Sequence, residues 1–286
     1  MDILALESFI AVAEQKSFSK ASDYLFVTQP AISKRVASLE EDLNTKLFNR
    51  INRQISLTEA GKQLLPRAKD LVIQAKDMQR YASNLSKDVS GKLSIAISHH
   101  VALYRMPPII KEFNGQFPHV DLDIRFEDSE VAFNAVEQGE IEFAVITLPK
   151  ELPQNLQSQV AWHDPLEVVV GQGHELTQYT HVDFSMLANF SCVLPTIETE
   201  THQIIQREFN KTNLKLKLQM STNNLQSLKM LVQAGLGWSL LPKTMIDDQL
   251  SIVDCGKQFS RDLGLVLHKK RILSNSAKEM LALIVG

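Results

Sequence analysis

The chain has 286 residues, of which 44% are hydrophobic and 22% are charged, and its formal net charge at pH 7 is −3. This length and composition predict two or three compact units with ordinary cores. They exclude a helical membrane protein, because no run approaches the roughly 18 uninterrupted apolar residues that a spanning helix needs. The first residues carry Asp2 and Glu7 where a signal peptide would be basic, so we expect a cytoplasmic protein.

Residues 3–14 predict an amphipathic helix, because apolar residues recur in it at helical spacing. Two shorter helices are expected to follow, with Ser19 as the N-cap of the second and Thr28 as the N-cap of the third. Pro30 then lies in the first turn of the third helix, where a missing N–H costs nothing. Two short helices joined by a tight polar turn are typical of a helix-turn-helix, whose second helix enters the major groove of DNA.

The start of the third predicted helix carries side chains that suit double-stranded DNA. Gln29 is expected to read a base edge, because an amide presents both a donor and an acceptor. Thr28, Ser33 and Lys34 are expected to contact phosphate or a neighbouring base, and Lys20 is expected to reach phosphate. A helical bundle with solvated charges would show a similar local pattern.

Residues 46–61 predict a two-stranded wing, because a polar stretch separates two apolar edges. Arg50 and Arg53 lie in that polar stretch and are therefore expected to face DNA.

The run "LESFIAVAEQKSFSKASDYLFVTQPAISKRVASLEEDLNTKLFNRINRQISLTEAG", residues 6–61, resembles the N-terminal pattern of the LysR-type transcriptional regulators. One departure is Asn44, where the family usually has Gly; Asn tolerates a left-handed backbone, so we expect the turn to form. The resemblance implies core positions at Ala21, Leu25, Ile32, Leu39 and Phe48. Together with the residue-level argument, it implies a DNA-binding set of Lys20, Thr28, Gln29, Pro30, Ser33, Lys34, Arg50 and Arg53.

Residues 59–89 predict one long helix after a winged helix-turn-helix domain at residues 1–58. Apolar residues alternate at spacings of four and three, which is a heptad seam. A helix packed on its own body would show the same seam, but the resemblance implies a linker that forms a homodimer. The predicted dimer set is Leu64, Ala68, Leu71, Ala75, Met78, Ala82 and Leu85.

Residues 90–286 alternate strand and helix patterns, which predicts a mostly parallel sheet with helices on both faces. The pattern restarts once, so two α/β halves are expected. Half I comprises about 92–161 and 267–286, and half II about 162–266. This arrangement resembles the family's bilobal effector domain, which is built like periplasmic solute-binding proteins. The predicted fold class is therefore a multidomain α+β and α/β protein.

Ligands in such sheets bind beyond the carboxyl ends of strands, in the crevice between halves. Loops at those places predict an effector set of Ser98, His99, His100, Thr147, Thr196, Thr201 and His202. Hydroxyls near helix-end amides suit a carboxylate or another small anion. The two histidines equally suit structural or solvated roles, and they have no third ligand for a metal.

The cysteines, Cys192 and Cys255, form no C-x-x-C pair and are expected to be buried free thiols, so no metal site or cofactor is expected.

The sequence as a whole predicts a sequence-specific DNA-binding transcription regulator controlled by a small-molecule effector, acting as a homodimer or homotetramer with the transcription machinery. A redox- or anion-responsive regulator that uses the two cysteines is the alternative. A secreted solute-binding protein is disfavoured by the N-terminal region. An enzyme is not expected, because no G-x-S-x-G, P-loop or H-E-x-x-H motif occurs.

Overall fold

The computed structural model describes residues 2–51, 54–86 and 88–286. It divides into unit 1, Met1–Lys87, and unit 2, Asp88–Gly286. Arg53, one of the predicted DNA-binding residues, lies outside the described residues, and the side chain of Arg50 is likewise not described. Among the described residues, no helix combines the length and apolar character needed to cross a membrane.

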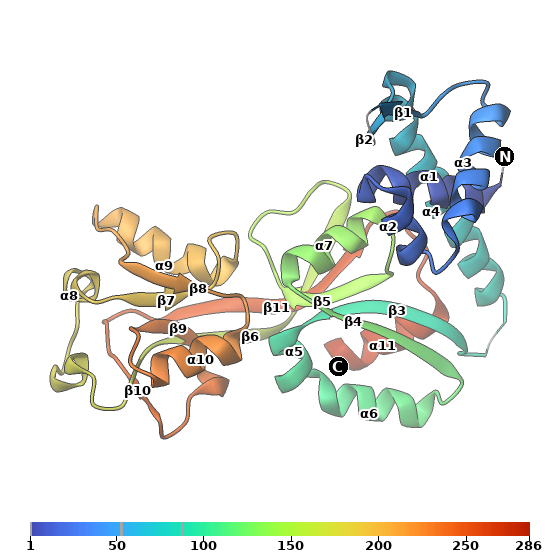
Figure 1. Cartoon of the computed structure of the whole chain (residues 1–286). Helices are drawn as coiled ribbons and strands as arrows, with labels where there is room; N and C mark the ends of the chain where they lie inside the picture. Colours follow the sequence, from blue (N-terminus) through green and yellow to red (C-terminus); the bar gives the residue numbers. More distant parts are fainter. Residues whose placement is uncertain (1, 52–53, 87) are drawn as a thin grey trace. The chain divides into compact units, whose positions relative to one another are not determined.

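Unit 1 begins with three helices and a two-stranded hairpin (Figure 1). These are α1 (Ile3–Gln15), α2 (Phe18–Tyr24), α3 (Gln29–Asp42), β1 (Phe48–Ile51) and β2 (Gln54–Leu57), with β1 antiparallel to β2. The N-cap of α2 is Ser17, whose Oγ accepts from the amide of Lys20, so the expectation for Ser19 is wrong by two residues. Thr28 is the N-cap residue of α3, as predicted, but its side chain makes no capping hydrogen bond.

The core of unit 1 contains the apolar positions that the helical spacing indicates. Ala21, Ile32, Leu39 and Phe48 are buried, and Leu25 is half-buried and packs against them. The ring of Phe48 contacts Phe9 edge-on, with centroids 5.5 Å apart. The hairpin is therefore fixed at its base by the same core that holds the helices.

The turns after α2 and α3 each contain a left-handed residue. Asn44 follows α3 with φ 48°, and the amides of Asn44 and Thr45 donate back to Glu41 and Glu40, so the turn forms as predicted. After α2 the same geometry holds at Phe26, with φ 54°, where Gly or Asn is the usual residue. The amides of Phe26 and Val27 donate to the carbonyl oxygens of Asp23 and Ser22, so backbone hydrogen bonds set the turn between α2 and α3.

The long helix α4 (Glu59–Asn84) begins at Thr58, whose Oγ1 accepts from the amide of Gly61. A Cβ at Gly61 would lie 2.3 Å from the carbonyl oxygen of Leu47, so only glycine fits this approach. The first part of α4 packs on unit 1 itself: Ala68 is buried there and Leu64 is half-buried. The dimer prediction for Ala68 is therefore wrong, because its side chain already belongs to the core of its own unit.

The second part of α4 exposes its seam. Leu71 is 41% exposed, Met78 73% and Leu85 74%, whereas Ala75 is half-buried and Ala82 exposed. Helix α4 ends at Asn84, before the expected end at residue 89, so Leu85 is its C-cap rather than a helical position. An apolar stripe on this stretch thus remains uncovered in the single chain.

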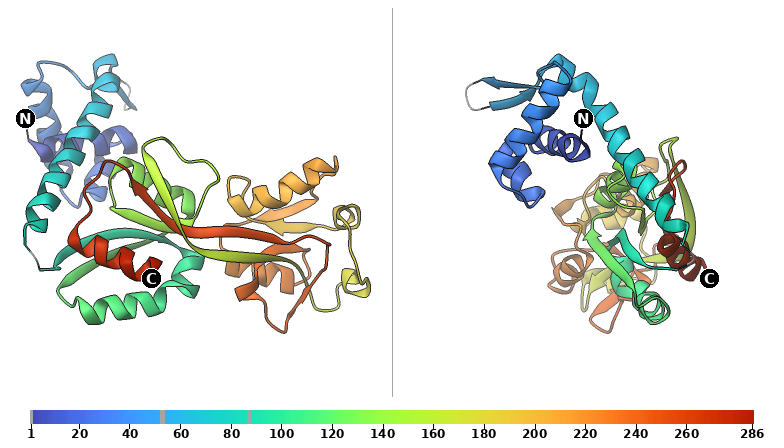
Figure 2. Two further views of the ribbon diagram at one scale, coloured as in Figure 1. Left: turned by 180° about the vertical axis from the view of Figure 1, so that it is seen from behind. Right: turned by 90° about the vertical axis from the view of Figure 1, so that its right-hand side faces the viewer.

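Unit 2 is built on a seven-stranded sheet. Its strand order is β10 (Leu250–Ile252), β6 (Leu156–Gly171), β11 (Phe259–His268), β5 (Phe143–Thr147), β3 (Gly91–Ser98) and β4 (Val120–Glu127), with β9 (Ser239–Pro242) also paired to β6. The first half contains strands that pair in parallel, as predicted, and helices on both faces (Figure 2). Its elements are β3 (Gly91–Ser98), α5 (His99–Tyr104), α6 (Met106–Gln116), β4 (Val120–Glu127), α7 (Ser129–Gln138), β5 (Phe143–Thr147) and α11 (Asn275–Val285).

Period-two alternation explains the two cores of this half. On β3, Ile95 and Ile97 face the core shared with α6 and α11, while Ala96 faces the core shared with α7. Phe113 of α6 and Met280 of α11 fill the first of these cores. The closing helix thus returns to the first half, as expected.

The second half contains the remaining elements, apart from the two long strands β6 and β11, and they pack around two cores of their own. They are η1 (Glu175–Gln178), α8 (Phe184–Asn189), β7 (Cys192–Leu194), α9 (Glu200–Lys211), β8 (Leu218–Ser221), α10 (Leu225–Gln233), β9 (Ser239–Pro242), η2 (Lys243–Met245) and β10 (Leu250–Ile252). Trp238 lies at the centre, where its indole N–H donates to the carbonyl of Leu187. The glycines around Trp238 follow α10, so this stretch ends a helix, as the sequence predicts.

Two long antiparallel strands, β6 (Leu156–Gly171) and β11 (Phe259–His268), run through both halves. Their direction departs from the mostly parallel sheet expected. Leu263 and Leu267 of β11 already pack in the first half, so the chain re-enters half I earlier than residue 267. Gly264 marks the crossing: a bulge lies beside it, and a Cβ there would lie 2.1 Å from the carbonyl oxygen of Gln159.

Candidate nucleic-acid interface and ligand cavity

The predicted DNA-binding residues that the structure describes lie on α2 and on the first turns of α3. Thr28, Gln29, Pro30 and Lys34 are exposed, Ser33 is half-buried, and Lys20 is exposed in the first turn of α2. Gln29 and Ser33 are four residues apart, so they share one face of the helix. This start of α3 therefore offers an amide, hydroxyls and a cation to a polyanion.

Glu40 connects the far end of α3 to the hairpin. Its buried carboxylate accepts from the amide of Leu47 (2.8 Å), from that of Phe48 (3.4 Å) and from Lys46 Nζ (2.9 Å). Burial acts to raise the pKa of Glu40, but these hydrogen bonds outweigh it and hold that pKa below its ordinary value. The carboxylate therefore stays ionised and fixes the hairpin against α3.

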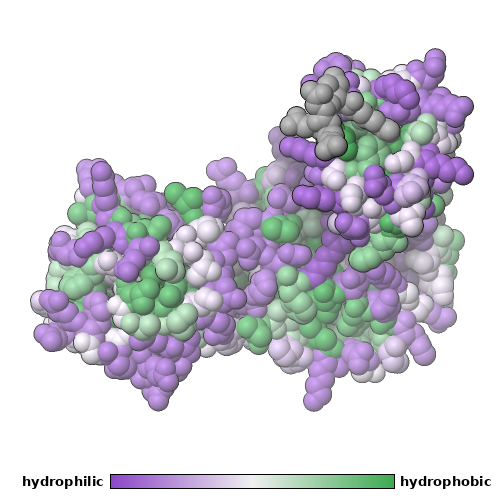
Figure 3. All heavy atoms as spheres, viewed as in Figure 1, coloured by the Kyte–Doolittle hydropathy of each residue, from purple (hydrophilic) through white to green (hydrophobic). Residues whose placement is uncertain are grey.

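Unit 2 contains a cavity of about 830 Å³ that is lined by residues of both halves. Hydrophilic residues gather between the two halves in the space-filling view (Figure 3). Five predicted ligand residues line the cavity: Ser98, His99, His100, Thr147 and Thr201.

Two predicted ligand residues do not line this cavity. Thr196 donates its amide and its hydroxyl to Asn223 Oδ1, each at 3.0 Å. His202 is buried, with Nδ1 2.8 Å from the carbonyl oxygen of Pro195. Both border a separate, shallower pocket. Thr196 lies in the loop before α9 and His202 lies on α9 itself, so position in the sequence does not determine the direction of each side chain.

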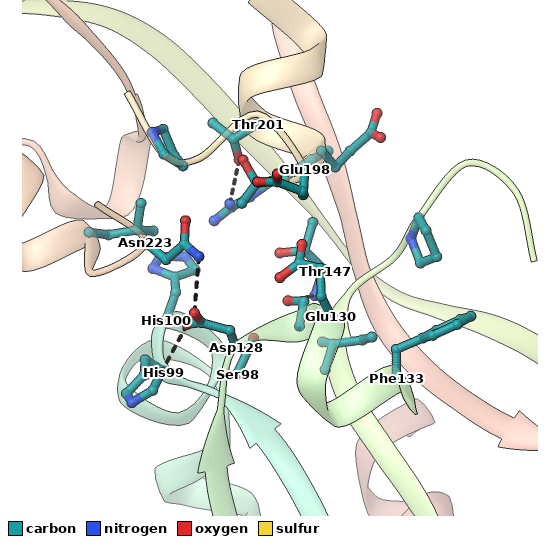
Figure 4. Close-up of a pocket in the computed structure, with 18 of the residues that line it drawn as sticks. Ser98, His99, His100, Asp128, Glu130, Phe133, Thr147, Glu198, Thr201 and Asn223 are labelled. Carbon is teal, nitrogen blue, oxygen red and sulfur yellow. Dashed lines mark hydrogen bonds and ion pairs between the residues drawn. The ribbon is translucent and has the colours of Figure 1, made fainter. Parts of the chain in front are cut away.

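Four polar side chains gather at the buried end of the cavity, two of which, His100 and Thr201, are labelled in Figure 4. Arg261 of β11 donates from Nε to Asp164 Oδ2 (2.9 Å) and from Nη1 to Thr201 Oγ1 (2.8 Å). His100 Nε2 lies 3.5 Å from the same Asp164 oxygen. The side chains of Asp164, Arg261, His100 and Thr201 are all buried.

The charges at this end follow from burial and from the neighbours. Burial lowers the pKa of His100, and Arg261 and Arg105 lower it further against the opposing effect of Asp164, so His100 is neutral at pH 7. Burial acts to raise the pKa of Asp164, but His100 and Arg261 outweigh it and keep the carboxylate ionised. Asp164 thus balances one of the two arginines.

Asp164 and Arg261 cannot be recognised as a pair from the sequence, because they lie 97 residues apart and meet only through the pairing of β6 with β11. The sequence does contain a signal for a buried charged pair. Each residue is charged and lies directly before or within an apolar strand pattern, where a buried charge needs a partner. The described residues contain no group of three or more side chains that could hold a metal ion.

The two halves touch directly across the cavity. Asn223 Nδ2 of the second half donates to Asp128 Oδ2 of the first at 3.0 Å, and Gln226 Nε2 donates to Tyr104 Oη at 2.9 Å. Thr196 fixes the orientation of the Asn223 amide, which gives this residue a supporting role beside the cavity. These bonds depend on the angle between the halves, so a ligand that changes the angle would change them.

The cysteines lie in the core of the second half. Both are free and buried. Burial raises the pKa of Cys192 to about 12, and it raises that of Cys255 as well. Both thiols are therefore protonated at neutral pH, which makes them poor nucleophiles.

Two family models match the chain. The model described as "Bacterial regulatory helix-turn-helix protein, lysR family" matches residues 3–62, and the model described as "LysR substrate binding domain" matches residues 86–286.

Curated relatives carry regulator names. An uncharacterized HTH-type transcriptional regulator in the ibpB-leuC intergenic region of Azotobacter vinelandii is 52% identical over 108 residues, which covers 38% of this chain and 75% of that protein. The uncharacterized HTH-type transcriptional regulator YbhD of Escherichia coli (strain K12) is 25% identical over 290 residues, which covers 100% of this chain and 91% of that protein.

Solved structures share the fold. CbnR complexed with its target DNA has a TM-score of 0.64 at 18% identity and covers 99% of this chain and 98% of its own. The effector-binding domain of QuiR in complex with shikimate has a TM-score of 0.62 at 15% identity, covering 69% and 96%. A hydrogen-peroxide-bound cysteine-to-serine mutant of Corynebacterium glutamicum OxyR has a TM-score of 0.58 at 22% identity, covering 99% and 93%.

Proposed function

Because this chain belongs to the LysR family of transcriptional regulators, we propose that it is a sequence-specific DNA-binding regulator whose activity is set by a small molecule bound between the two halves of unit 2. The observation that carries the proposal is the coexistence of an exposed Thr28-Gln29-Pro30 helix start with a large two-sided cavity on the same chain. Double-stranded DNA and the transcription machinery are the proposed partners, and the cytoplasm is the proposed location.

The proposed DNA contacts follow the residue types. Gln29 reads a base, because an exposed side-chain amide at the helix start can form two hydrogen bonds with the edge of one base. Lys20 and Lys34 contact phosphate, and Thr28 and Ser33 complete the contact surface. Pro30 places the helix start, and Arg50 and Arg53 of the wing predicted from the sequence contact DNA. One copy of unit 1 makes few DNA contacts, and a dimer that presents two copies doubles their number.

The proposed control is differential binding. A small molecule in the cavity contacts both halves, so it favours the interdomain angle at which all of its contacts form. A ligand that binds both arrangements equally has no effect. Ser98, His99, His100, Thr147 and Thr201 are the proposed contacts from the sequence, to which the geometry adds Arg261. The structure of QuiR with shikimate offers a parallel for a small carboxylate in this type of domain.

The test is footprinting of the purified full chain on the DNA upstream of its own gene, with random duplex as competitor. We expect protection in two or more helically phased patches at moderate salt. Weak protection that is indifferent to sequence and vanishes with salt would contradict a sequence-specific regulator acting at that site. A saturating ligand that leaves footprint and bend unchanged would contradict the proposed control.

The redox alternative is disfavoured by the burial of both thiols. The similarity to peroxide-bound OxyR concerns the fold alone, and it supplies no reactive cysteine here. An oxidant-responsive thiol is normally an exposed thiolate, whereas Cys192 and Cys255 are buried and protonated.

A further inference from the structure

Two carboxylates face the cavity from opposite halves (Figure 4). Glu130 lies on α7 of the first half, and Glu198 lies in the loop before α9 of the second half; both line the cavity. Among the described residues neither forms an ion pair. Two other cavity acids do have partners: Glu200 forms an ion pair with Arg207 at 2.7 Å, and Asp128 accepts a hydrogen bond from Asn223.

The charged neighbours that shift the pKa of Glu130 are two carboxylates, although Lys150, Arg207 and Arg261 line the same cavity. Burial raises the pKa of Glu130, and the carboxylates of Asp128 and Glu198 raise it further, against a hydrogen bond from its own amide. Two like charges placed on opposite walls oppose approach of the two halves. A positive group between them would remove this opposition.

The buried end of the cavity offers the opposite chemistry. Ser98 and Arg261 are both 7% exposed, both line the cavity, and Ser98 Oγ and Arg261 Nη2 have no hydrogen-bond partner among the described residues. Buried polar groups are rarely left unpaired, so these two point to a group that completes them. A carboxylate accepts from a hydroxyl and from a guanidinium at once, and charge-assisted bonds of this kind are strong.

Apolar side chains line the cavity as well. Leu103, Tyr104 and Phe133 come from the first half, and Met245 comes from the second. Such a wall suits a short hydrocarbon segment better than a second array of polar groups.

We propose that the effector is a zwitterion, with a carboxylate held by Ser98 and Arg261, an ammonium or guanidinium group held between Glu130 and Glu198, and a short apolar segment between them. This proposal rests on the proposed function and names the chemical class of its ligand. The cationic end contacts both halves at once, so binding converts a repulsive pair into a bridge and favours the closed arrangement.

The experiment uses the full-length protein and isothermal titration calorimetry. The probes are ω-aminoalkanoates of about three to eight carbons, with the alkanoate and the alkylamine of each length as matched controls. We expect one length of aminoalkanoate to bind about tenfold or more tightly than the alkanoate of equal length, since each end adds a charge-assisted contact.

The variants separate the two ends. Glu130→Gln combined with Glu198→Gln should bring the aminoalkanoate and the alkanoate to within about twofold of each other. Each single substitution should remove part of the preference. Ser98→Ala should weaken the binding of both the aminoalkanoate and the alkanoate. Glu279→Gln makes the same charge change as each single substitution, at an exposed position of α11 outside the cavity, and should leave every affinity unchanged.

Two results would overturn the proposal: alkanoates that bind as tightly as aminoalkanoates, or a panel in which no aminoalkanoate binds. Neither result bears on DNA binding, which the footprint tests separately. If the protein keeps its DNA footprint but binds only alkanoates, it is an effector-controlled regulator whose ligand is a simple anion.

Discussion

At the residue scale, Gln29 and Lys34 both lie on the first turns of α3 and make separable predictions. Gln29→Ala should reduce discrimination between specific and random duplex by about 1–3 kcal/mol, because an amide that bonds to a base edge carries sequence information. Lys34→Ala should weaken binding to both duplexes alike and reduce the salt dependence of the affinity, because each phosphate contact releases counterions. Competition binding across salt concentrations measures both effects, with exposed Lys111→Ala of α6 as the control. Equal losses on both duplexes for Gln29→Ala would contradict its base-reading role.

Glu40 makes a prediction about stability and pH. Glu40→Gln should lower the free energy of unfolding of unit 1 by about 1.5–3 kcal/mol near pH 7, because a buried carboxylate loses charge-assisted hydrogen bonds. Since the pKa of Glu40 is lowered in the folded state, this stabilisation is fully present above the ordinary carboxyl pKa and is lost as the pH falls through the lowered value.

Urea denaturation followed at about pH 7 and about pH 3 checks the sign of this effect. The difference between the wild type and Glu40→Gln should shrink at the lower pH. The exposed neighbour Glu41 supplies the control, and Glu41→Gln should change the unfolding free energy little at either pH. A difference that grows on acidification would contradict the proposed role of Glu40.

At the element scale, the exposed seam of α4 predicts association of two chains. Leu71→Lys combined with Met78→Lys should convert a dimer to monomers, because two charges on a covered apolar stripe cannot be paired there. Light scattering after size-exclusion chromatography measures the mass. Gln74→Lys with Gln79→Lys adds the same charge at exposed polar positions of α4 and should leave the mass unchanged. A wild-type monomer would contradict the dimer.

The same helix shows what periodicity can establish. The heptad spacing predicted a long helix with one apolar stripe, and α4 has both. Spacing cannot identify the partner of that stripe, and here α1 takes the first turns, including Ala68, while Leu71 and Met78 remain exposed. The short helix α5, expected as a loop, shows a related limit: six residues carry too little periodicity to be recognised.

At the scale of the whole molecule, the order of elements was more predictable than the ligand site. Strand and helix patterns indicated two α/β halves and the return of α11 to the first. They did not indicate that β6 and β11 run antiparallel through both halves, and it is this pairing that places Asp164 beside Arg261. Contacts between residues far apart in the sequence depend on register, which a single strand pattern does not contain.

The burial of the thiols gives a prediction for the intact protein. Hydrogen peroxide should leave the DNA footprint of the wild type unchanged, because Cys192 and Cys255 are buried and protonated. The variant with Cys192→Ala and Cys255→Ala, titrated with the same oxidant, is the comparison. An oxidant effect in the wild type that disappears in this variant would restore the redox alternative.

The crossing of β6 and β11 makes the second half an uninterrupted insert within the first, since its core runs from Leu166 to Phe259 whereas the core of the first half needs both Leu93 and Ile284. During synthesis at about 5–20 residues per second, unit 1 is therefore complete roughly 10–40 s before α11 is available to complete the first half of unit 2. The second half can fold while α11 is still being made, but the first half must wait for it. A chain truncated before α11 would contain a complete unit 1 joined to an incomplete unit 2. We expect such a chain to compete with the intact protein for DNA without responding to a ligand.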